Sequence, residues 1–247
     1  MNTRRFVDCI TESAANYPHI TFSKSGAAYT CVNPFSYHIV RRNADLFGAF
    51  DGLYVDGMLM CKLINLLWRR SIPRLSFDMS GMAVDLFRLL DEAAGDKTVY
   101  FIGAKQEELE KSVAQIRRSY PRMAVAGYRN GYFLDVDDRR RAIRDIVDSG
   151  ADFAIVGMGA PLQEQFALDL RDAGFKGIVF TCGGFLHQTA DRINYYPDWV
   201  NRYNLRAFYR LFHEKGLWGR LYNVLIEFPV LFTYDTIRSR WIVSSTS

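Results

Sequence analysis

Residues 152–173, DFAIVGMGAPLQEQFALDLRDA, carry the clearest indication of fold in this 247-residue chain. The first part is a short apolar run that ends in glycines, and the second part has the apolar spacing of an amphipathic helix starting near Pro161. Proline suits the first turn of a helix, because its missing N–H costs no hydrogen bond there. A buried strand followed by such a helix is half of a βαβ unit and indicates a parallel sheet.

The same pattern recurs along the middle of the chain. Three further apolar runs rich in Val, Ile or Phe predict strands, at 98–103, 123–128 and 177–184. Amphipathic spacing predicts helices beside them, at 82–94, 106–118 and 139–146. Ser80 is expected to cap the first of these helices. We therefore predict an α/β fold with a Rossmann-like, mostly parallel sheet flanked by helices.

The first 75 residues fit this scheme less regularly. YTCVNP at 29–34 predicts a strand that ends at its proline, and helices are expected over 37–48 and 58–70. Between these helices lies FDGLYVDG, residues 50–57, with two Asp-Gly dipeptides. Asp-Gly is a frequent turn former, so this stretch is predicted to be rich in turns.

The charge of the chain is concentrated near its C-terminus. The formal net charge is +4, and residues 192–247 carry all of it, since they hold eight basic and four acidic residues. This region is also rich in Tyr, Trp and Phe, interleaved with arginines at roughly helical spacing. Such a segment fits an anionic partner such as a phosphate or a membrane surface, or simply a helix packed on the core. We predict an α/β domain over 1–191 and a helical, basic-aromatic, membrane-facing appendage over 192–247.

Composition excludes several classes of protein. The sequence has no run of about 18 apolar residues, so no spanning helix is predicted, and its first residues lack the apolar core of a signal peptide. The four cysteines lack metal-ligand spacing and indicate a reducing compartment. A net charge of +4 is small for a nucleic-acid-binding protein. We therefore expect a cytoplasmic protein that can touch a membrane and binds no nucleic acid.

Gly157 and Gly159 fall between a predicted strand and helix, where backbone amides can approach a phosphate. A dinucleotide-binding fingerprint would need a third glycine where Leu162 stands, and an acid after the next strand, where Thr181-Cys-Gly-Gly stands. These departures disfavour a nucleotide-dependent oxidoreductase, which stays open as an alternative. Glycines at such turns are often purely structural.

Aspartates supply two candidate kinds of site. Asp51-Gly52 and Asp56-Gly57 could each be an ordinary turn, or could supply a general base if the loop lies at the carboxyl edge of the sheet, and composition does not choose. Asp135-Val-Asp137 has the ligand types for a divalent cation. Because an arginine-rich helix follows directly, helix capping is favoured and no metal site is predicted.

Read in order, the motifs of this chain resemble the WecG/TagA/CpsF family of bacterial glycosyltransferases (glycosyltransferase family 26). The resemblance covers about residues 29–222, and its most specific part is VGMGAPLQE at 156–164. The other motifs are Asn33-Pro34, ADL at 44–46 leading to Asp51-Gly52, VYFIG at 99–103, Tyr120-Pro121, Gly127-Tyr128, GYF at 131–133, CGGF at 182–185, and Tyr209-Arg210-Leu211 with Arg220.

The resemblance implies an inverting, metal-independent enzyme of bacterial polysaccharide synthesis. Such an enzyme moves a sugar from a nucleotide-diphosphate donor, expected to be UDP-linked, to a polyprenyl-diphosphate-linked sugar. It implies no cofactor, a place on the inner face of the cell membrane, and an appendage over 192–247 that completes the active site of the catalytic domain at the membrane. Assembly into a homo-oligomer stays open.

The resemblance also assigns roles to individual residues. Asp51 matches the proposed base of the family, and Gln163 matches a position in its active site. Arg210 and Arg220 match arginines expected to stabilise the leaving diphosphate. Substrate contacts are expected at Asn33, Arg74, Gly103, Tyr128, Gly157, Gly159, Glu164, Gly183 and Gly184. Leu186 and Leu217 depart from the family pattern, which keeps open a non-catalytic scaffold of a polysaccharide assembly complex.

Overall fold

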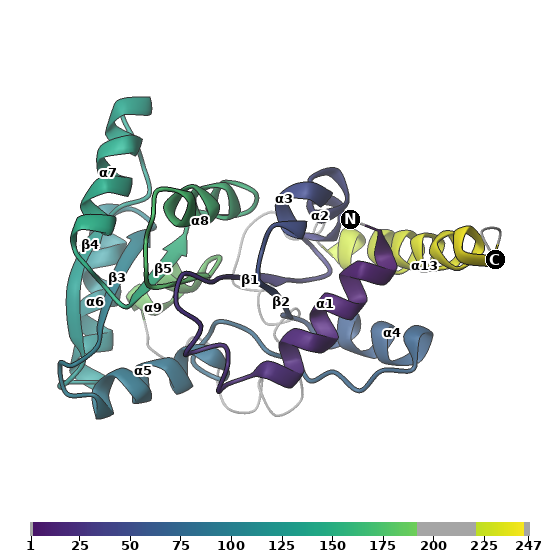
Figure 1. Ribbon diagram of the computed structural model, residues 1–247, viewed down its shortest axis with the longest axis horizontal. Helices are drawn as coiled ribbons and strands as arrows, with labels where there is room; N and C mark the ends of the chain where they lie inside the picture. Colours follow the sequence, from purple (N-terminus) through teal and green to yellow (C-terminus); the bar gives the residue numbers. More distant parts are fainter. Residues whose placement is uncertain (1, 192–220, 245–247) are drawn as a thin grey trace.

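The computed structural model describes residues 2–191 and 221–244, and its centre is one six-stranded sheet (Figure 1). The strand order is β2-β1-β6-β5-β3-β4, and every neighbouring pair is parallel. This confirms the predicted α/β class with a parallel sheet. The strands are β1 (Ala28–Val32), β2 (Gly52–Val55), β3 (Thr98–Gly103), β4 (Ala124–Arg129), β5 (Phe153–Gly157) and β6 (Ile178–Thr181).

Helices cover both faces of the sheet. On one face a core cluster joins the strands to α1, α2, α3, α4, α7, α8 and α13, and on the other a second cluster joins them to α5, α6 and α9. Alternate strand residues supply the two cores, as the side-chain alternation of a strand requires: Tyr100 and Ile102 face the first, Val99 and Phe101 the second. The helices are α1 (Thr3–Asn16), α2 (Tyr37–Arg42), α3 (Ala44–Gly48), α4 (Met58–Trp68), α5 (Met82–Glu92), α6 (Gln106–Ser119), α7 (Val136–Asp148), α8 (Leu162–Asp172), α9 (Phe185–Asp191), the π-helix η1 (Asn223–Glu227) and α13 (Phe228–Ser244).

The N-terminal third contains the elements that sequence patterns described least well. The stretch expected to be rich in turns contains β2, whose four residues are all buried. The single helix expected over 37–48 is wrong, because it breaks at Asn43, where φ −122° and ψ 42° are not helical. Ser80 does not cap α5: Gly81 holds the cap position, and the Ser80 hydroxyl donates to Asp78 instead.

The connections diverge at the carboxyl ends of two neighbouring strands. From β1 the chain passes through α2 and α3 to β2, at one end of the sheet. From β6 the chain passes to α9, which packs on α6. Helix α6 connects β3 and β4, which lie on the side of β6 away from β1. Adjacent strands with diverging connections form the switch point where open parallel sheets bind ligands. The carboxyl edge at β1 and β6 is therefore where a site is expected.

The C-terminal helix α13 packs beside α1 and α4 (Figure 1). Its buried Phe228 and Phe232 pack edge-on against the ring of Tyr37, with centroids 5.3 and 5.5 Å away. Asp235 accepts two hydrogen bonds from Arg41, at 2.6 and 3.0 Å, and one from the Tyr37 hydroxyl at 2.9 Å. The described part of the predicted appendage is thus helical and attached to α2, while the boundary at residue 192 stays a prediction. Within the two described ranges, no helix combines the length and the apolar character needed to cross a membrane.

Candidate active site

Glycines allow the carboxyl ends of β3, β5 and β6 to approach one another closely. Gly103 has φ +145°, and a Cβ there would lie 2.1 Å from the carbonyl oxygen of Gly157. A Cβ on Gly157 would lie 2.7 Å from Sγ of Cys182. No side chain fits either position, so these glycines have the structural use considered from sequence. They also bring the predicted nucleotide-binding turns to one edge.

The start of α8 is tied to the glycine turn that follows β6. Oε1 of Gln163 accepts a hydrogen bond from the Gly183 N–H at 3.0 Å, and its Nε2 donates to Oε1 of Glu164 at 2.8 Å. The same Glu164 oxygen accepts from the Thr30 hydroxyl at 3.0 Å, and that hydroxyl accepts from Thr181 at 2.6 Å. This buried network joins β1, β6, α8 and the turn at the switch point.

The carboxyl group of Glu164 and the amide group of Gln163 are both buried below the carboxyl edge of the sheet. Glu164 is 0% exposed and Gln163 is 4% exposed. Burial raises the pKa of the Glu164 carboxyl, which its hydrogen bonds with Gln163 and Thr30 offset only in part. The structure therefore brings Gln163 to the expected turn. Contact of either side chain with a substrate stays a prediction.

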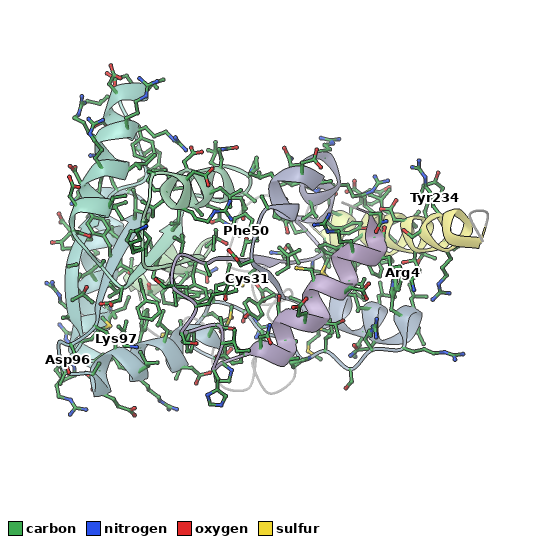
Figure 2. All side chains as sticks on the ribbon, in the orientation of Figure 1. Arg4, Cys31, Phe50, Asp96, Lys97 and Tyr234 are labelled. Atoms are coloured by element: carbon green, nitrogen blue, oxygen red, sulfur yellow. The ribbon has the colours of Figure 1, made fainter. Side chains whose placement is uncertain are left out.

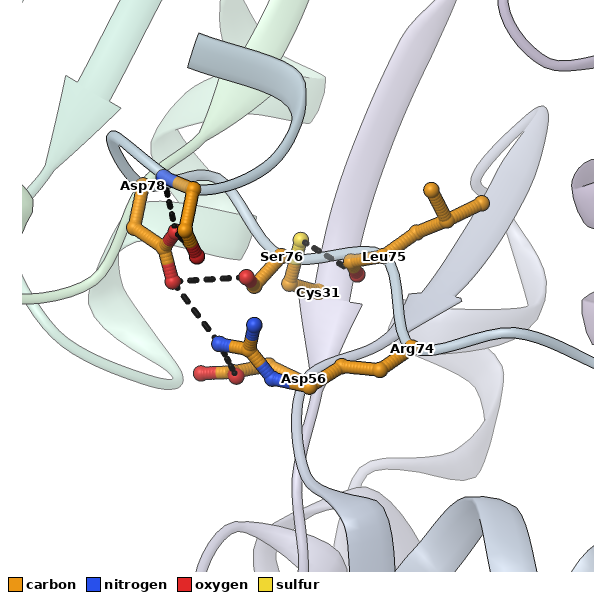
Figure 3. Close-up of polar contacts among 7 residues, drawn as sticks. Cys31, Asp56, Arg74, Leu75, Ser76 and Asp78 are labelled. Carbon is orange, nitrogen blue, oxygen red and sulfur yellow. Dashed lines mark hydrogen bonds and ion pairs between the residues drawn. The ribbon is translucent and has the colours of Figure 1, made fainter. Parts of the chain in front are cut away.

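An ionic cluster lies at the carboxyl end of β2 (Figure 3). Asp56 directly follows the strand, and its N–H donates to the carbonyl of Val32 at the end of β1. One terminal nitrogen of Arg74 donates to carboxylate oxygens of Asp56 and Asp78, each at 2.8 Å. Burial lowers the pKa of Arg74, but the two carboxylates outweigh it and raise that pKa above its ordinary value. Arg74 is therefore a fixed cation at the predicted edge.

The two carboxylates of this cluster differ in their surroundings. Asp78 accepts further hydrogen bonds from the Ser76 hydroxyl at 2.6 Å and from the Ser80 N–H and hydroxyl at 2.8 and 2.6 Å. Its side chain is 18% exposed, whereas that of Asp56 is 40% exposed. Asp78 thus holds Arg74 and its loop in place, and Asp56 presents a carboxylate to solvent.

Asp51 lies at the opposite edge of the sheet. It precedes β2, and its Oδ2 accepts from the N–H of Ala28, the first residue of β1, at 3.0 Å. Its Oδ1 pairs with Nζ of Lys24 at 2.6 Å. The four-residue β2, about 13 Å long, separates it from Asp56. The expectation that Asp51 lies near the glycine turns is therefore wrong, because the unpredicted strand β2 runs between the two Asp-Gly dipeptides.

The remaining predicted residues are dispersed along the carboxyl edge. Asn33 follows β1, and its Oδ1 accepts from the Ser36 N–H at 2.8 Å. Tyr128 is 38% exposed near the end of β4, the last strand of the sheet. Gly159 and Gly184 lie in the turns that lead into α8 and α9. Arg210, Arg220 and Leu217 lie outside the described residues.

Two further observations concern Leu186, which departs from the family pattern, and the Asp135-Val-Asp137 motif, which has the ligand types of a metal site. Leu186 is fully buried in the second core cluster, so it serves packing between α9 and the sheet. Asp135 caps α7 by accepting from the Asp138 N–H at 2.7 Å, which confirms the capping interpretation. Among residues 2–191 and 221–244, no group of three His, Cys, Asp or Glu side chains could hold a metal ion.

Sequence reasoning did not single out Thr30 and Thr181. Each is a hydroxyl residue within an otherwise apolar strand, in AYTCV and IVFT, and each is 1% exposed. A buried hydroxyl must find a hydrogen-bond partner, so polar residues inside buried strands were an available signal. The identity of the partner required the structure.

The switch point of this parallel sheet carries glycine turns and a helix N-terminus, and a carboxylate–guanidinium cluster lies at the end of the neighbouring β2, which together fit an α/β enzyme that binds its ligand at this edge. Residues 4–242 match the glycosyl transferase WecG/TagA/CpsF family, and the chain belongs to this family. It is a glycosyltransferase, as the resemblance predicted, and the family match gives no support to an oxidoreductase.

Curated relatives cover most of the chain. It is 32% identical over 208 residues to the UDP-Gal:alpha-D-GlcNAc-diphosphoundecaprenol beta-1,4-galactosyltransferase of Shigella boydii, covering 84% of this chain and 86% of the relative. It is 27% identical over 231 residues to the N-acetylglucosaminyldiphosphoundecaprenol N-acetyl-beta-D-mannosaminyltransferase of Bacillus subtilis (strain 168), covering 90% and 83%. The enzyme of the same name from Bacillus spizizenii is 26% identical, covering 91% and 86%.

Proposed function

We propose that this chain transfers a sugar from a UDP-linked donor to N-acetylglucosamine carried on a polyprenyl diphosphate, with inversion and without an obligatory metal. The names of all three relatives specify this acceptor, while the transferred sugar is galactose in one name and N-acetylmannosamine in the other two. The observation that supports the chemistry best is the exposed Asp56 carboxylate beside Arg74, on the edge that also carries the glycine turns.

In the proposed reaction Asp56, rather than Asp51, is the general base. A hydroxyl oxygen of the acceptor sugar attacks the anomeric carbon of the donor from the side opposite the diphosphate. The hydroxyl proton passes to the Asp56 carboxylate as the new glycosidic bond forms, and the bond to the diphosphate oxygen breaks. Base catalysis of this kind contributes roughly 10²–10⁴ in rate.

The departing nucleotide diphosphate needs positive partners. Arg74 is one candidate among the described residues, because a fixed donor of this kind stabilises developing charge without reorganisation. The glycine turns are a second candidate, apart from the Gly183 N–H, which already donates to Gln163. Arg210 and Arg220 keep the role that the family resemblance gives them, as guanidiniums that complete the site.

Contact with a membrane is supported by the outer surface of the C-terminal segment. Exposed apolar side chains recur along it at near-helical spacing, and the exposed Leu66 lies on the neighbouring α4. Exposed arginines accompany them, and Figure 2 shows Arg4 of α1 and Tyr234 of α13 at the same end of the molecule. An apolar surface with guanidiniums beside it fits an anionic bilayer. The apolar residues are Tyr222, Leu225, Ile226, Val230, Tyr234 and Ile237, and the arginines are Arg4, Arg69, Arg70, Arg238 and Arg240.

The test of the reaction is a transfer assay with a synthetic polyprenyl-diphosphate N-acetylglucosamine. UDP-galactose, UDP-N-acetylmannosamine and UDP-N-acetylglucosamine are offered as separate radiolabelled donors, in the presence of EDTA. We expect transfer from at least one donor, and NMR of the product should give the anomeric configuration opposite to that of the donor. Retention, or a strict requirement for a divalent cation, would contradict the proposal.

A further inference from the structure

Glu164 is an unusual side chain for its location. It is 0% exposed, and its Oε2 has no hydrogen-bond partner among the described residues. None of the ion pairs formed by the described residues includes it. An ionised carboxylate is strongly disfavoured where it is buried without a cation. Burial without a cation favours the neutral acid, and it correspondingly raises the pKa of this carboxyl.

The hydrogen bonds of Glu164 determine how the neighbouring amide is oriented. Gln163 can present either its oxygen or its NH₂ group toward the Gly183 N–H, and only the oxygen can accept from it. Because Oε1 of Glu164 accepts from Nε2 of Gln163, the amide oxygen is left to face the turn. Thr30, itself hydrogen-bonded by Thr181, holds that same Glu164 oxygen from the side of the sheet.

We propose that Glu164 is a positioning residue for sugar transfer: as an uncharged acid it orients Gln163, and through Gln163 it holds the Cys182–Gly184 turn in the conformation that receives the diphosphate of the donor. This role rests on the proposed function. It replaces the direct substrate contact expected from sequence, because a residue with no exposed surface acts through its neighbours.

The experiment compares variants that keep or remove the acceptor at position 164. Glu164→Gln keeps a neutral amide oxygen, so the KM for the UDP-sugar should stay within about threefold of the wild type. Glu164→Leu removes the acceptor and should raise that KM, and the Kd of UDP measured by calorimetry, by about tenfold or more, with a smaller change in kcat. Thr30→Val removes one donor to Glu164 and should raise the KM about threefold, which keeps the test decisive if the leucine variant does not fold.

Ser112→Ala is the matched structural control. Ser112 forms a buried hydroxyl pair with Thr189 at 2.5 Å between α6 and α9, so its loss should lower Tm without changing the KM. Glu164→Leu and Thr30→Val variants that also lose only Tm would overturn the positioning role. If Glu164→Gln raised the KM as much as Glu164→Leu, that result would contradict the claim that Glu164 acts as an uncharged acid. A wild type that transfers no sugar overturns the proposed function as well, whereas an active wild type with an unchanged KM in the variants overturns this inference alone.

Discussion

Asp51 and Asp56 share an Asp-Gly sequence and lie at opposite ends of one strand. Asp51 is paired with Lys24 at 2.6 Å and accepts from the backbone of β1, so its carboxylate links structural elements at the amino edge. Asp56 is paired with Arg74 at 2.8 Å, and its side chain is 40% exposed at the carboxyl edge. The two Asp-Gly aspartates therefore have different chemical environments, and we expect their substitution to have different effects.

Asp56→Asn should lower kcat by about 10² or more, because the amide cannot take the proton of the acceptor hydroxyl. UDP binding should change little, and Tm should fall modestly because the ion pair with Arg74 is weakened. Asp51→Asn is the matched control and should keep kcat within about threefold, with a modest loss of stability from the weakened Lys24 pair. Transfer assays, UDP calorimetry and thermal melts measure the three quantities. Loss of turnover in Asp51→Asn with normal turnover in Asp56→Asn would reverse the assignment.

Arg74 allows a second prediction at the level of one side chain. One of its two terminal nitrogens contacts both Asp56 and Asp78, and a lysine side chain reaches less far from the backbone, so its ammonium would not meet both carboxylates at these distances. Arg74→Lys should lower kcat/KM by about tenfold and leave the fold intact. Arg74→Ala should also lower the free energy of unfolding by about 1–3 kcal/mol, because Asp78 then loses its half-buried ion pair and hydrogen bond with Arg74. Urea unfolding that gives equal stabilities for Arg74→Ala and wild type would contradict this account.

At the scale of secondary structure, the strands with long apolar runs were predictable and β2 was not. The four residues GLYV are buried through contacts made across the chain, such as the Leu53 N–H donating to Ser13 of α1 at 3.0 Å. The flanking Asp-Gly pairs indicate turns regardless of those contacts. Without β2, no sequence argument could assign the two aspartates to opposite edges, so the base candidate depended on an element that only tertiary structure establishes.

The candidate site was predictable to a similar extent. The glycine turns at Gly103, Gly157 and Gly183 followed from a strand-then-glycine pattern that repeats along the chain, and parallel strands bring such turns to one edge. The network joins Thr30 to Glu164, 134 positions away, at 3.0 Å, and Glu164 to its neighbour Gln163 at 2.8 Å. Their pairing depends on which strands are neighbours, which the sequence pattern does not encode.

Helix α8 gives a prediction about pH through Glu164. Its folded-state pKa is raised by burial above the ordinary 4.5 that the unfolded chain retains. As pH rises above 4.5, the unfolded chain releases this proton while the folded protein keeps it, so the stability of the wild type falls with pH until the folded pKa is passed. Glu164→Gln lacks this dependence and should gain stability relative to the wild type as pH increases. Urea unfolding at several pH values measures the difference, and a difference independent of pH would refute it.

At the scale of the whole molecule, the exposed apolar side chains of η1 and α13 predict a bilayer-binding surface. Replacing both Ile226 and Val230 with Glu should reduce pelleting with phosphatidylglycerol vesicles several-fold, since two apolar contacts are lost and two like charges are added. Added salt should weaken wild-type pelleting through the arginines. Transfer to a short-chain, water-soluble acceptor should be unchanged.

Ile20→Glu is the control for that experiment. Ile20 is 50% exposed, close to the 52% of Ile226. It follows the C-terminal end of α1, whereas the N-terminal end of α1 lies near α13 (Figure 1). Its replacement should leave vesicle pelleting unaffected. Equal losses in both variants would indicate a general effect of added negative charge, and no loss in either would exclude η1 and α13 as the contact surface.

The contact of Asp235 with Arg41 and Tyr37 has a geometric consequence. Tyr37 begins α2 only four residues after Asn33, which directly follows β1 at the switch point. A helix lying on lipid and fastened there would set the height and tilt of the sheet above the headgroups. The diphosphate of the acceptor lies at a fixed distance from its prenyl tail. A site held at a set height above the headgroups would therefore reach only acceptor sugars at that distance from the bilayer.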